Sequence, residues 1–237
     1  MKPTSFIKRL LSPRSVETPH VLIPACDYPA LEILNKKLGH QKSKKSAQPI
    51  DAEGNPIPWY TYPAIEYLRQ LDFSGKSVFE FGSGNSTLFW GRKASQVVAV
   101  ENNLEWYEHC KKDQASNVKL RLEQNRDDYI GSILKTGLMF DVIVVDGDHR
   151  MECAEKSLEC LNPTGVVILD NSDWFPKTAK FLRSQNLIQV DFSGFGPVND
   201  YTWTTSIFLT RSFEVVPQST LPQHPVGGLV QYGEGEE

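Results

Sequence analysis

The sequence has few cysteines, no long apolar run and no excess of positive charge. Its 237 residues include four cysteines, none in a Cys-x-x-Cys pair, which argues against a zinc site or a disulfide framework and favours the reducing cytoplasm. No apolar stretch approaches the ~18 residues of a membrane span, and no apolar segment with a cleavage site predicts secretion. With 25 basic and 29 acidic residues, the net charge of −4 lacks the basic excess typical of nucleic-acid binding.

A strand, a glycine turn and the start of a helix follow one another within Ser77–Ser86, SVFEFGSGNS. Glycines let a ligand approach the backbone closely, and a helix N-terminus presents free N–H groups. Glu80 lies at the strand end, where a carboxylate suits a cation better than a pyrophosphate. S-adenosylmethionine (SAM) is a ligand of this kind, because it carries an ammonium and a sulfonium group. The strand end, glycine turn and helix start thus form a predicted cofactor-binding cradle. Its predicted cofactor-binding residues are Glu80, Gly82, Ser83, Gly84, Asn85 and Ser86.

A second apolar strand, Gln96–Glu101, ends in an acid 21 positions after Glu80. A carboxylate there accepts hydrogen bonds from ribose hydroxyls, so Glu101 and its neighbour Asn102 are predicted to bind the cofactor. The two segments resemble the class I SAM-dependent methyltransferases, whose first motif is acid-x-Gly-x-Gly and whose second ends in an acid. The third glycine of the fuller family pattern is absent, and Ser86 stands near its position.

From position 76 onward, apolar strands alternate with helical segments, which predicts a parallel sheet covered on both faces. Residues 194–201 are too short for a crossover helix, so the last two strands should be antiparallel. We therefore expect an α/β fold: a three-layer, Rossmann-like methyltransferase sandwich with a seven-stranded, mostly parallel sheet and an antiparallel last strand. The predicted strands are 77–82, 96–101, 118–122, 140–145, 165–169, 188–192 and 205–210. The predicted helices are 85–93, 104–114, 127–135, 150–161 and 176–185.

Three regions are expected along the chain: an N-terminal helical and loop extension (1–55), a SAM-binding domain (56–212) and a partly disordered tail (213–237). The boundary is placed at the turn-rich segment 51–58, DAEGNPIP. Helices are expected at 30–38 and 63–71. Residues 5–11 form a basic amphipathic pattern, for which a packed helix and a peripheral membrane contact are the alternatives.

Ligands of open α/β sheets bind outside the carboxyl ends of the strands. In class I methyltransferases an acid after the third strand accepts a hydrogen bond from the adenine amino group, and Asp127 and Asp128 follow the third predicted strand here. Helix capping is the alternative role for either residue. Asp127 and Asp146, which ends the fourth strand, complete the predicted cofactor site.

The ends of the fourth and fifth strands, Asp146-Gly-Asp-His and Asp170-Asn-Ser-Asp-Trp, resemble the cation-dependent O-methyltransferases of catechol and caffeoyl-CoA type. The resemblance implies that Asp146, Asp170 and Asn171 hold Mg²⁺, whose preferred ligands are oxygens. His149 stands where the family has a lysine base and could take a hydroxyl proton. His149 and Asp146 are thus the predicted catalytic residues. The alternative is that Asp170 and Asn171 only form a turn.

The expected function is SAM-dependent O-methylation of a small-molecule or sugar hydroxyl. An NAD(P)-dependent oxidoreductase and a non-catalytic methyltransferase-fold binding protein are the alternatives. Enzymes that methylate nucleic-acid bases usually carry an Asn/Asp-Pro-Pro-aromatic motif after the fourth strand, and Asp-Gly-Asp-His stands here instead. The acceptor loops are expected at 148–151, 172–177 and 194–201. The acceptor itself and the oligomeric state are left open by the sequence.

Overall fold

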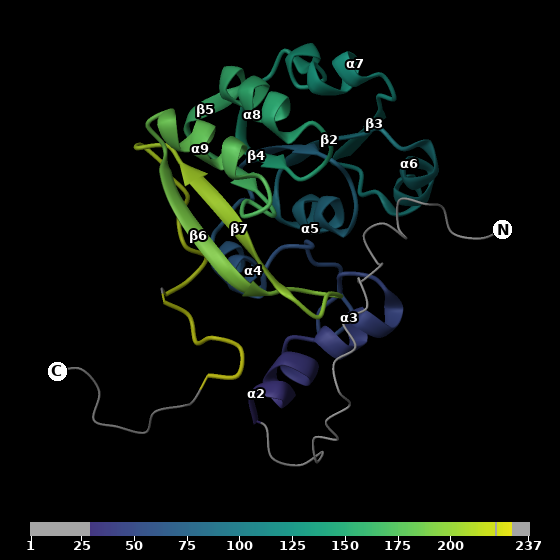
Figure 1. The fold of residues 1–237 in the computed structure, drawn as a ribbon, viewed down its shortest axis with the longest axis vertical. Helices are drawn as coiled ribbons and strands as arrows, with labels where there is room; N and C mark the ends of the chain where they lie inside the picture. Colours follow the sequence, from purple (N-terminus) through teal and green to yellow (C-terminus); the bar gives the residue numbers. More distant parts are fainter. Residues whose placement is uncertain (1–28, 221, 229–237) are drawn as a thin grey trace.

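The computed structural model describes residues 29–220 and 222–228, and within them the chain forms a seven-stranded sheet with helices on both faces (Figure 1). The strands are β1 (Ser77–Phe81), β2 (Gln96–Glu101), β3 (Val118–Leu122), β4 (Phe140–Val145), β5 (Leu161–Leu169), β6 (Ile188–Phe195) and β7 (Thr202–Leu209). Their order across the sheet is β3-β2-β1-β4-β5-β7-β6.

The strand directions confirm the predicted fold class. Neighbouring strands from β3 to β5 pair in parallel. Strand β7 is antiparallel to both β5 and β6, because the connection after Phe195 is too short for a crossover. The chain is therefore a three-layer, Rossmann-like sandwich with an antiparallel last strand.

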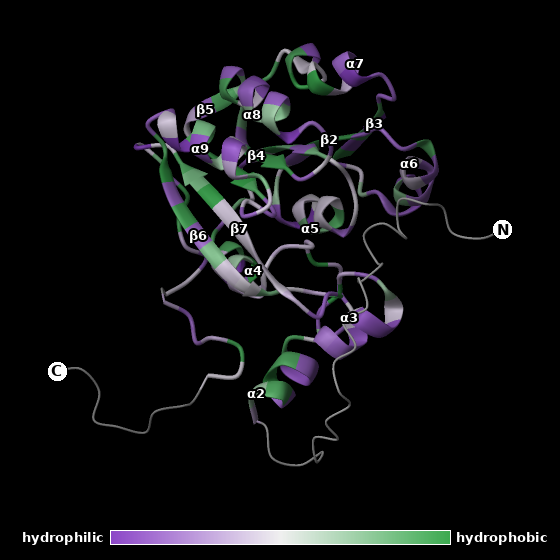
Figure 2. Cartoon of the chain, viewed as in Figure 1, coloured by the Kyte–Doolittle hydropathy of each residue, from purple (hydrophilic) through white to green (hydrophobic). Residues whose placement is uncertain are grey.

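Alternate residues of the central strands face opposite sides of the sheet, and each side has its own apolar core. Val78 faces the core that contains α4 (Tyr62–Arg69) and α5 (Asn85–Lys93). Phe79 faces the core that contains α7 (Arg126–Ile130), α8 (Arg150–Glu159) and α9 (Pro176–Ser184). Strands buried on both faces need continuous apolar sequences, which is the pattern that identified them. In Figure 2 hydrophobic colour gathers on the central strands, whereas α3 (His40–Ser46) and α7 are mostly hydrophilic.

Some predicted helices differ from the structure. The predicted helix 127–135 is two pieces, α7 and the 3₁₀ turn η3 (Leu134–Thr136), because Gly131 is a poor helix former and the Ser132 hydroxyl bonds back to the Tyr129 carbonyl at 2.6 Å. The segment 104–114 forms α6 (Leu104–Cys110) and the 3₁₀ turn η2 (Lys111–Asp113). The predicted helix 30–38 is a short α2 (Pro29–Glu32) continued by a π-helix, η1 (Ile33–Lys37).

Three strands are longer than predicted, and one of them is β7, which begins at Thr202 rather than 205. Strand β5 begins at Leu161 rather than 165, with a register shift against β4. Strand β6 runs to Phe195 rather than 192, and Phe195 pairs with Thr202. Gly194 suggested a turn but lies inside β6, where a Cβ would come within 3.3 Å of the Pro63 ring. The glycine therefore allows α4 to approach the strand.

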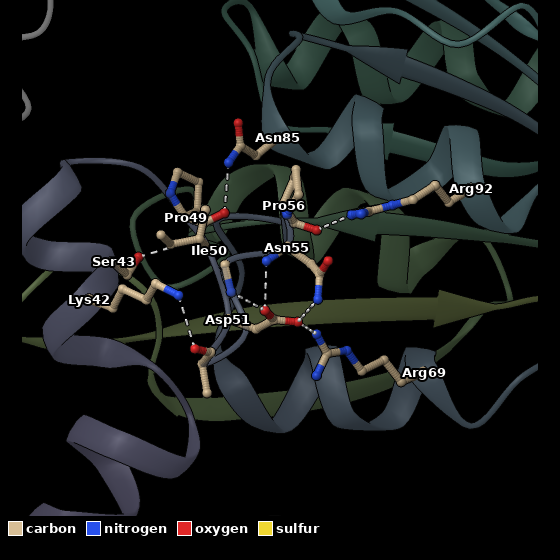
Figure 3. A network of polar contacts seen from close by, with 12 residues as sticks. Lys42, Ser43, Pro49, Ile50, Asp51, Asn55, Pro56, Arg69, Asn85 and Arg92 are labelled. Atoms are coloured by element: carbon tan, nitrogen blue, oxygen red, sulfur yellow. Dashed lines mark hydrogen bonds and ion pairs between the residues drawn. The ribbon is translucent and has the colours of Figure 1, made fainter.

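The segment 51–58, predicted as a linker, is held firmly against α4 and α5 (Figure 3). The Asp51 carboxylate accepts a hydrogen bond from the Asn55 backbone N–H at 2.8 Å and one from Arg69 of α4 at 2.9 Å. Just before it, the Pro49 carbonyl accepts from the Asn85 side chain of α5 at 2.7 Å. The domain boundary placed here stays a prediction, and the segment 5–11 lies outside the described residues.

The described part of the C-terminal tail lies along α4. The backbone N–H of Gln218 donates to the Gln70 carbonyl at 2.8 Å, and that of Val226 donates to the Glu66 carboxylate at 2.7 Å. Across residues 29–220 and 222–228, no helix has the length and apolar content that a membrane span requires.

We expect removal of residues 218–237 to lower the melting temperature by a few degrees, because about 0.5–1.5 kcal/mol is lost with each hydrogen bond to α4. Thermal unfolding of a chain that ends at Pro217 tests this. A chain that ends at Gly228 keeps those bonds and is the matched control. Equal melting temperatures for the shortened and full chains would mean that the tail adds nothing to stability.

Candidate functional site

The carboxyl ends of β1, β2, β4 and β5 meet at one edge of the sheet, where the predicted site residues lie. The turn after β1 passes very close to the turn after β4. Gly82 has φ +98°, and a Cβ on it would lie 3.3 Å from the Gly147 backbone. A glycine is therefore required at this position. The next residues, Ser83 and Gly84, lead directly into α5, whose N-terminus opens at the same edge.

Glu80 is buried, with an exposed fraction of 1%. One carboxylate oxygen, Oε2, accepts a hydrogen bond from the Thr87 hydroxyl at 2.5 Å. The other, Oε1, has no hydrogen-bond partner among the described residues. Burial raises the pKa of Glu80 to about 8, although the Ser86 and Thr87 hydroxyls lower it. An unpaired buried oxygen of this kind is suited to a cationic donor, which would restore the charge of the carboxylate.

Two more buried polar groups of the described chain, the Tyr60 hydroxyl and the Trp90 indole N–H, have no hydrogen bond of normal geometry, although the indole lies close enough to the hydroxyl to lower its pKa. Burial raises the pKa of Tyr60 well above its usual value, and the charges of Glu80 and Asp146 add to that effect. Tyr60 thus lies close to the acidic ends of β1 and β4. No local motif in the sequence marks it as a site residue.

Glu101 is fixed by its own neighbours at the end of β2. Its Oε1 accepts from the backbone N–H groups of Asn102 at 3.0 Å and Asn103 at 2.9 Å. Its Oε2 accepts from the Ser83 hydroxyl at 2.9 Å, which joins the glycine turn to β2. Burial raises the pKa of Glu101, while these donors lower it. The carboxylate is held in position to accept further hydroxyl hydrogen bonds.

Trp106 of α6 is a site residue that sequence reasoning missed. Its indole N–H donates to the Ser83 carbonyl at 2.7 Å, and its ring lies 3.8 Å from the position of a Cβ on Gly84. The side chain therefore supports the glycine turn from the β2 side. In the sequence, this role was indicated only by the place of Trp106 in the first turn of the helix that follows Glu101, which Asn103 caps.

The remaining predicted cofactor residues differ in their surroundings. The Asn102 amide donates to the Asp148 carboxylate at 2.8 Å, which links the ends of β2 and β4. Asp127 is exposed and pairs with Arg126 at 3.1 Å. Asn125, not Asp127, caps α7. The side-chain N–H of Asn85 donates to the Pro49 carbonyl and is therefore already engaged.

Asp146, Asp170 and Asn171, the predicted metal ligands, come together around a guanidinium. Arg150 donates to the Asp146 carboxylate at 3.0 Å and to the Asn171 side-chain oxygen at 3.3 Å. The Asp170 carboxylate instead accepts from Trp203 of β7 at 3.1 Å and from the Thr205 hydroxyl at 2.5 Å. Burial raises the pKa of both Asp146 and Asp170, and Arg150 lowers both.

These residues do not fit the predicted Mg²⁺. Mg²⁺ requires oxygens at about 2.0–2.1 Å in octahedral geometry. Here the guanidinium lies between the oxygens, and the Asp170 carboxylate is engaged with β7. The prediction missed Arg150 because it followed the family pattern of ligands. The signal was present in the sequence, since Arg150 follows Asp146 at a spacing of four residues.

His149 lies at the start of α8 with φ +53°, a left-handed conformation that is uncommon for a residue other than glycine. Its ring is 6.4 Å from that of Tyr129 on α7, in an edge-on arrangement. The Tyr129 hydroxyl lies over Gly147, where an added Cβ would come within 2.0 Å of it. The base assignment of His149 stays a prediction.

Two of the predicted acceptor loops meet at an exposed pair of aromatic rings. Trp174, after β5, and Tyr201, before β7, are 49% and 43% exposed. Their ring centroids are 6.0 Å apart, with the planes 38° from parallel. Two adjacent, half-exposed rings offer an apolar surface to a ligand.

No protein-family model matches the chain, and no curated protein sequence is detectably similar to it. Among solved structures, an O-methyltransferase from Bacillus cereus in complex with SAH matches with a TM-score of 0.53 and 18% identity, over 80% of this chain and 93% of that one. A methyltransferase from Pyrococcus furiosus matches at 20% identity with a TM-score of 0.46, over 63% and 83% of the two chains. The first similarity supports the class I methyltransferase fold for this chain.

Proposed function

We propose that the protein is a SAM-dependent methyltransferase that acts on the hydroxyl of a small molecule or a saccharide. The observation that carries the proposal is the buried Glu80 carboxylate, whose Oε1 lacks a partner within the described residues beside the glycine turn. A hydrogen-bond donor such as an ammonium group would satisfy it at this edge of the sheet. SAM carries its ammonium and sulfonium groups on the same molecule as a ribose and an adenine.

The chain would hold SAM through three elements. Glu80 faces the ammonium, backbone N–H groups at the start of α5 face the carboxylate, and Glu101 accepts from the ribose hydroxyls. Bound there, SAM supplies an electrophilic methyl group. The residues around it orient the acceptor oxygen for in-line attack, so that methyl transfer becomes effectively unimolecular.

The acceptor side of the proposal lies at the ends of β4 and β5. Trp174 and Tyr201 offer exposed aromatic rings against which a planar or sugar ring can stack. His149 is proposed as the base that takes the acceptor proton. A net charge of −4 favours a small molecule over nucleic acid as the partner. The cytoplasmic location stays a prediction of the sequence.

Replacing Glu101 with Ala should weaken SAM binding by about 1.5–3 kcal/mol, the range for hydrogen bonds to charged groups. This corresponds to roughly a ten- to a hundredfold change in Kd. Calorimetry with the purified chain measures it, and Glu108→Ala, an exposed acid on α6, is the matched control. Unchanged SAM affinity in the Glu101 variant would refute the ribose assignment.

The same titration separates the alternative functions. An oxidoreductase of this fold would bind NAD(P) in preference to SAM. A carboxylate at the end of β1 disfavours a pyrophosphate, so preferential binding of SAM would exclude this alternative. A non-catalytic binding protein would bind SAM and its product equally, yet show no methyl transfer to any hydroxyl acceptor in a screen of phenols, sugars and hydroxylated acids.

A further inference from the structure

The Arg150 side chain uses all five of its N–H groups at the ends of β4 and β5. Its Nε donates to the Gly147 carbonyl at 3.0 Å. One terminal nitrogen donates to the Asp170 carbonyl and, at 3.3 Å, to the Asn171 side-chain oxygen. The other donates to the Asp146 carbonyl at 3.1 Å and to its carboxylate at 3.0 Å. An arginine has five N–H donors in a planar fork, so none remains for a substrate.

The guanidinium is also enclosed. The Arg150 side chain is 10% exposed, and its charged carbon lies 4.4 Å from the centroid of the Phe175 ring, in a cation–π contact. A permanently charged, planar group is thus fixed by two strand ends on its edges and by an aromatic ring on its face. Such a side chain cannot leave its position without breaking contacts to both β4 and β5.

A divalent cation and this guanidinium compete for the same oxygens. A metal would need the Asp146 carboxylate and the Asn171 oxygen at about 2.0–2.1 Å, whereas these oxygens now lie 3.0 and 3.3 Å from guanidinium nitrogens. Arg150 provides a positive charge that a chelator cannot remove. It follows Asp146 by four residues, so the cation is attached to the chain beside its own carboxylate.

We propose that Arg150 is a built-in cation that takes the place of a divalent metal, so that these residues bind no metal in this protein. Arg150 is a positioning residue: it acts through Asp146 and Asn171, whose separation it fixes. The proposal requires neither SAM binding nor a known acceptor. It can therefore be tested on the protein alone, and its failure would leave the proposed function untouched.

The test is a Mn²⁺ titration followed by electron paramagnetic resonance, with the full chain in five forms: wild type, Asp146→Asn, Arg150→Met, Arg150→Lys and Arg150→Met with Asp146→Asn. Methionine keeps an apolar stem against Phe175. Wild type and Arg150→Lys should bind Mn²⁺ only weakly. Arg150→Met should bind it about tenfold more tightly or better, because the Asp146 carboxylate and the Asn171 side-chain oxygen are then free to ligate. The added Asp146→Asn change should abolish that gain.

Two results would overturn the proposal. One is stoichiometric Mn²⁺ binding by the wild type that Asp146→Asn removes, which would mean that the guanidinium does not occupy the metal position. The other is a folded Arg150→Met variant that gains no affinity for Mn²⁺. Circular dichroism establishes whether each variant is folded. If Arg150→Met is unfolded, the wild type, Arg150→Lys and Asp146→Asn still decide between weak and stoichiometric binding.

Discussion

Replacing Glu80 with Gln is expected to reduce SAM affinity by about a hundredfold and, at the same time, to stabilise the cofactor-free fold above pH 6. The loss of affinity follows because an amide cannot pair with the ammonium, and a buried charge pair broken on one side costs about 3 kcal/mol or more. The gain in stability follows because the buried Glu80 destabilises the fold when it loses its proton, whereas glutamine stays neutral. The two effects have one cause, the burial of this carboxyl group at the end of β1.

The direction of the pH effect follows from the pKa. Burial raises the pKa of Glu80 from 4.5 in the unfolded chain to about 8 in the fold. Between these values the folded chain binds more protons than the unfolded one, so stability falls as pH rises from about 4.5 to 8. At about 1.4 kcal/mol for each pKa unit, the loss amounts to a few kcal/mol. Glu80→Gln removes this loss, because an amide does not titrate.

SAM binding should couple to the same proton. If the ammonium pairs with Glu80, the carboxyl group must ionise, so binding releases a proton and affinity rises between pH 5.5 and 7.5. Above that range the ammonium of the ligand itself begins to titrate, since an α-amino group has a pKa near 7.7–8.0. Calorimetry in buffers of different ionisation enthalpy measures the proton release. A wild-type affinity that does not change with pH, or Gln variant binding equal to wild type, would contradict the role of Glu80.

The central strands could be predicted from the sequence because they are buried on both faces. In Phe140–Val145 only Asp141 is partly exposed, and the predicted bounds of this strand are those observed. The predicted strand boundaries were wrong where tertiary contacts determine them. Gly194 suggested a turn, yet it lies within β6 because Pro63 of α4 packs against it. The register of β5 against β4 likewise depends on a shift that no local pattern predicts.

The site was predictable in its location and only partly in its contacts. The rule that ligands bind at the carboxyl ends of parallel strands placed Glu80, Glu101 and Asp146 at one edge. The hydrogen-bond partners of these side chains could not be predicted. Arg150 reaches its oxygens from the start of α8, and Trp106 reaches Ser83 from α6. Such contacts depend on the separation of elements in space, which a spacing along the chain does not define.

Because Asp146, Asp170 and Asn171 do not fit a metal, the prediction that His149 is the base becomes more specific. A metal would acidify an acceptor hydroxyl, but Arg150 has no free N–H with which to do so. A side chain must then take the proton. The Asp146 carboxylate is held by Arg150, which leaves His149, at the start of α8, as the predicted base. Catalysis should therefore be insensitive to EDTA and dependent on His149.

His149→Asn is expected to lower turnover by ~10²–10⁴, the usual contribution of a positioned acid–base group, with SAM affinity unchanged. Asparagine is the sharper substitution because it tolerates the left-handed backbone at this position and cannot act as a base near neutral pH. Glu155→Gln, an exposed change on the same helix, is the matched control. The assay uses the acceptor found in the hydroxyl screen, with and without EDTA. Wild-type turnover by the His149 variant would mean that the acceptor loses its proton to water, and that the site accelerates methyl transfer by proximity and orientation alone.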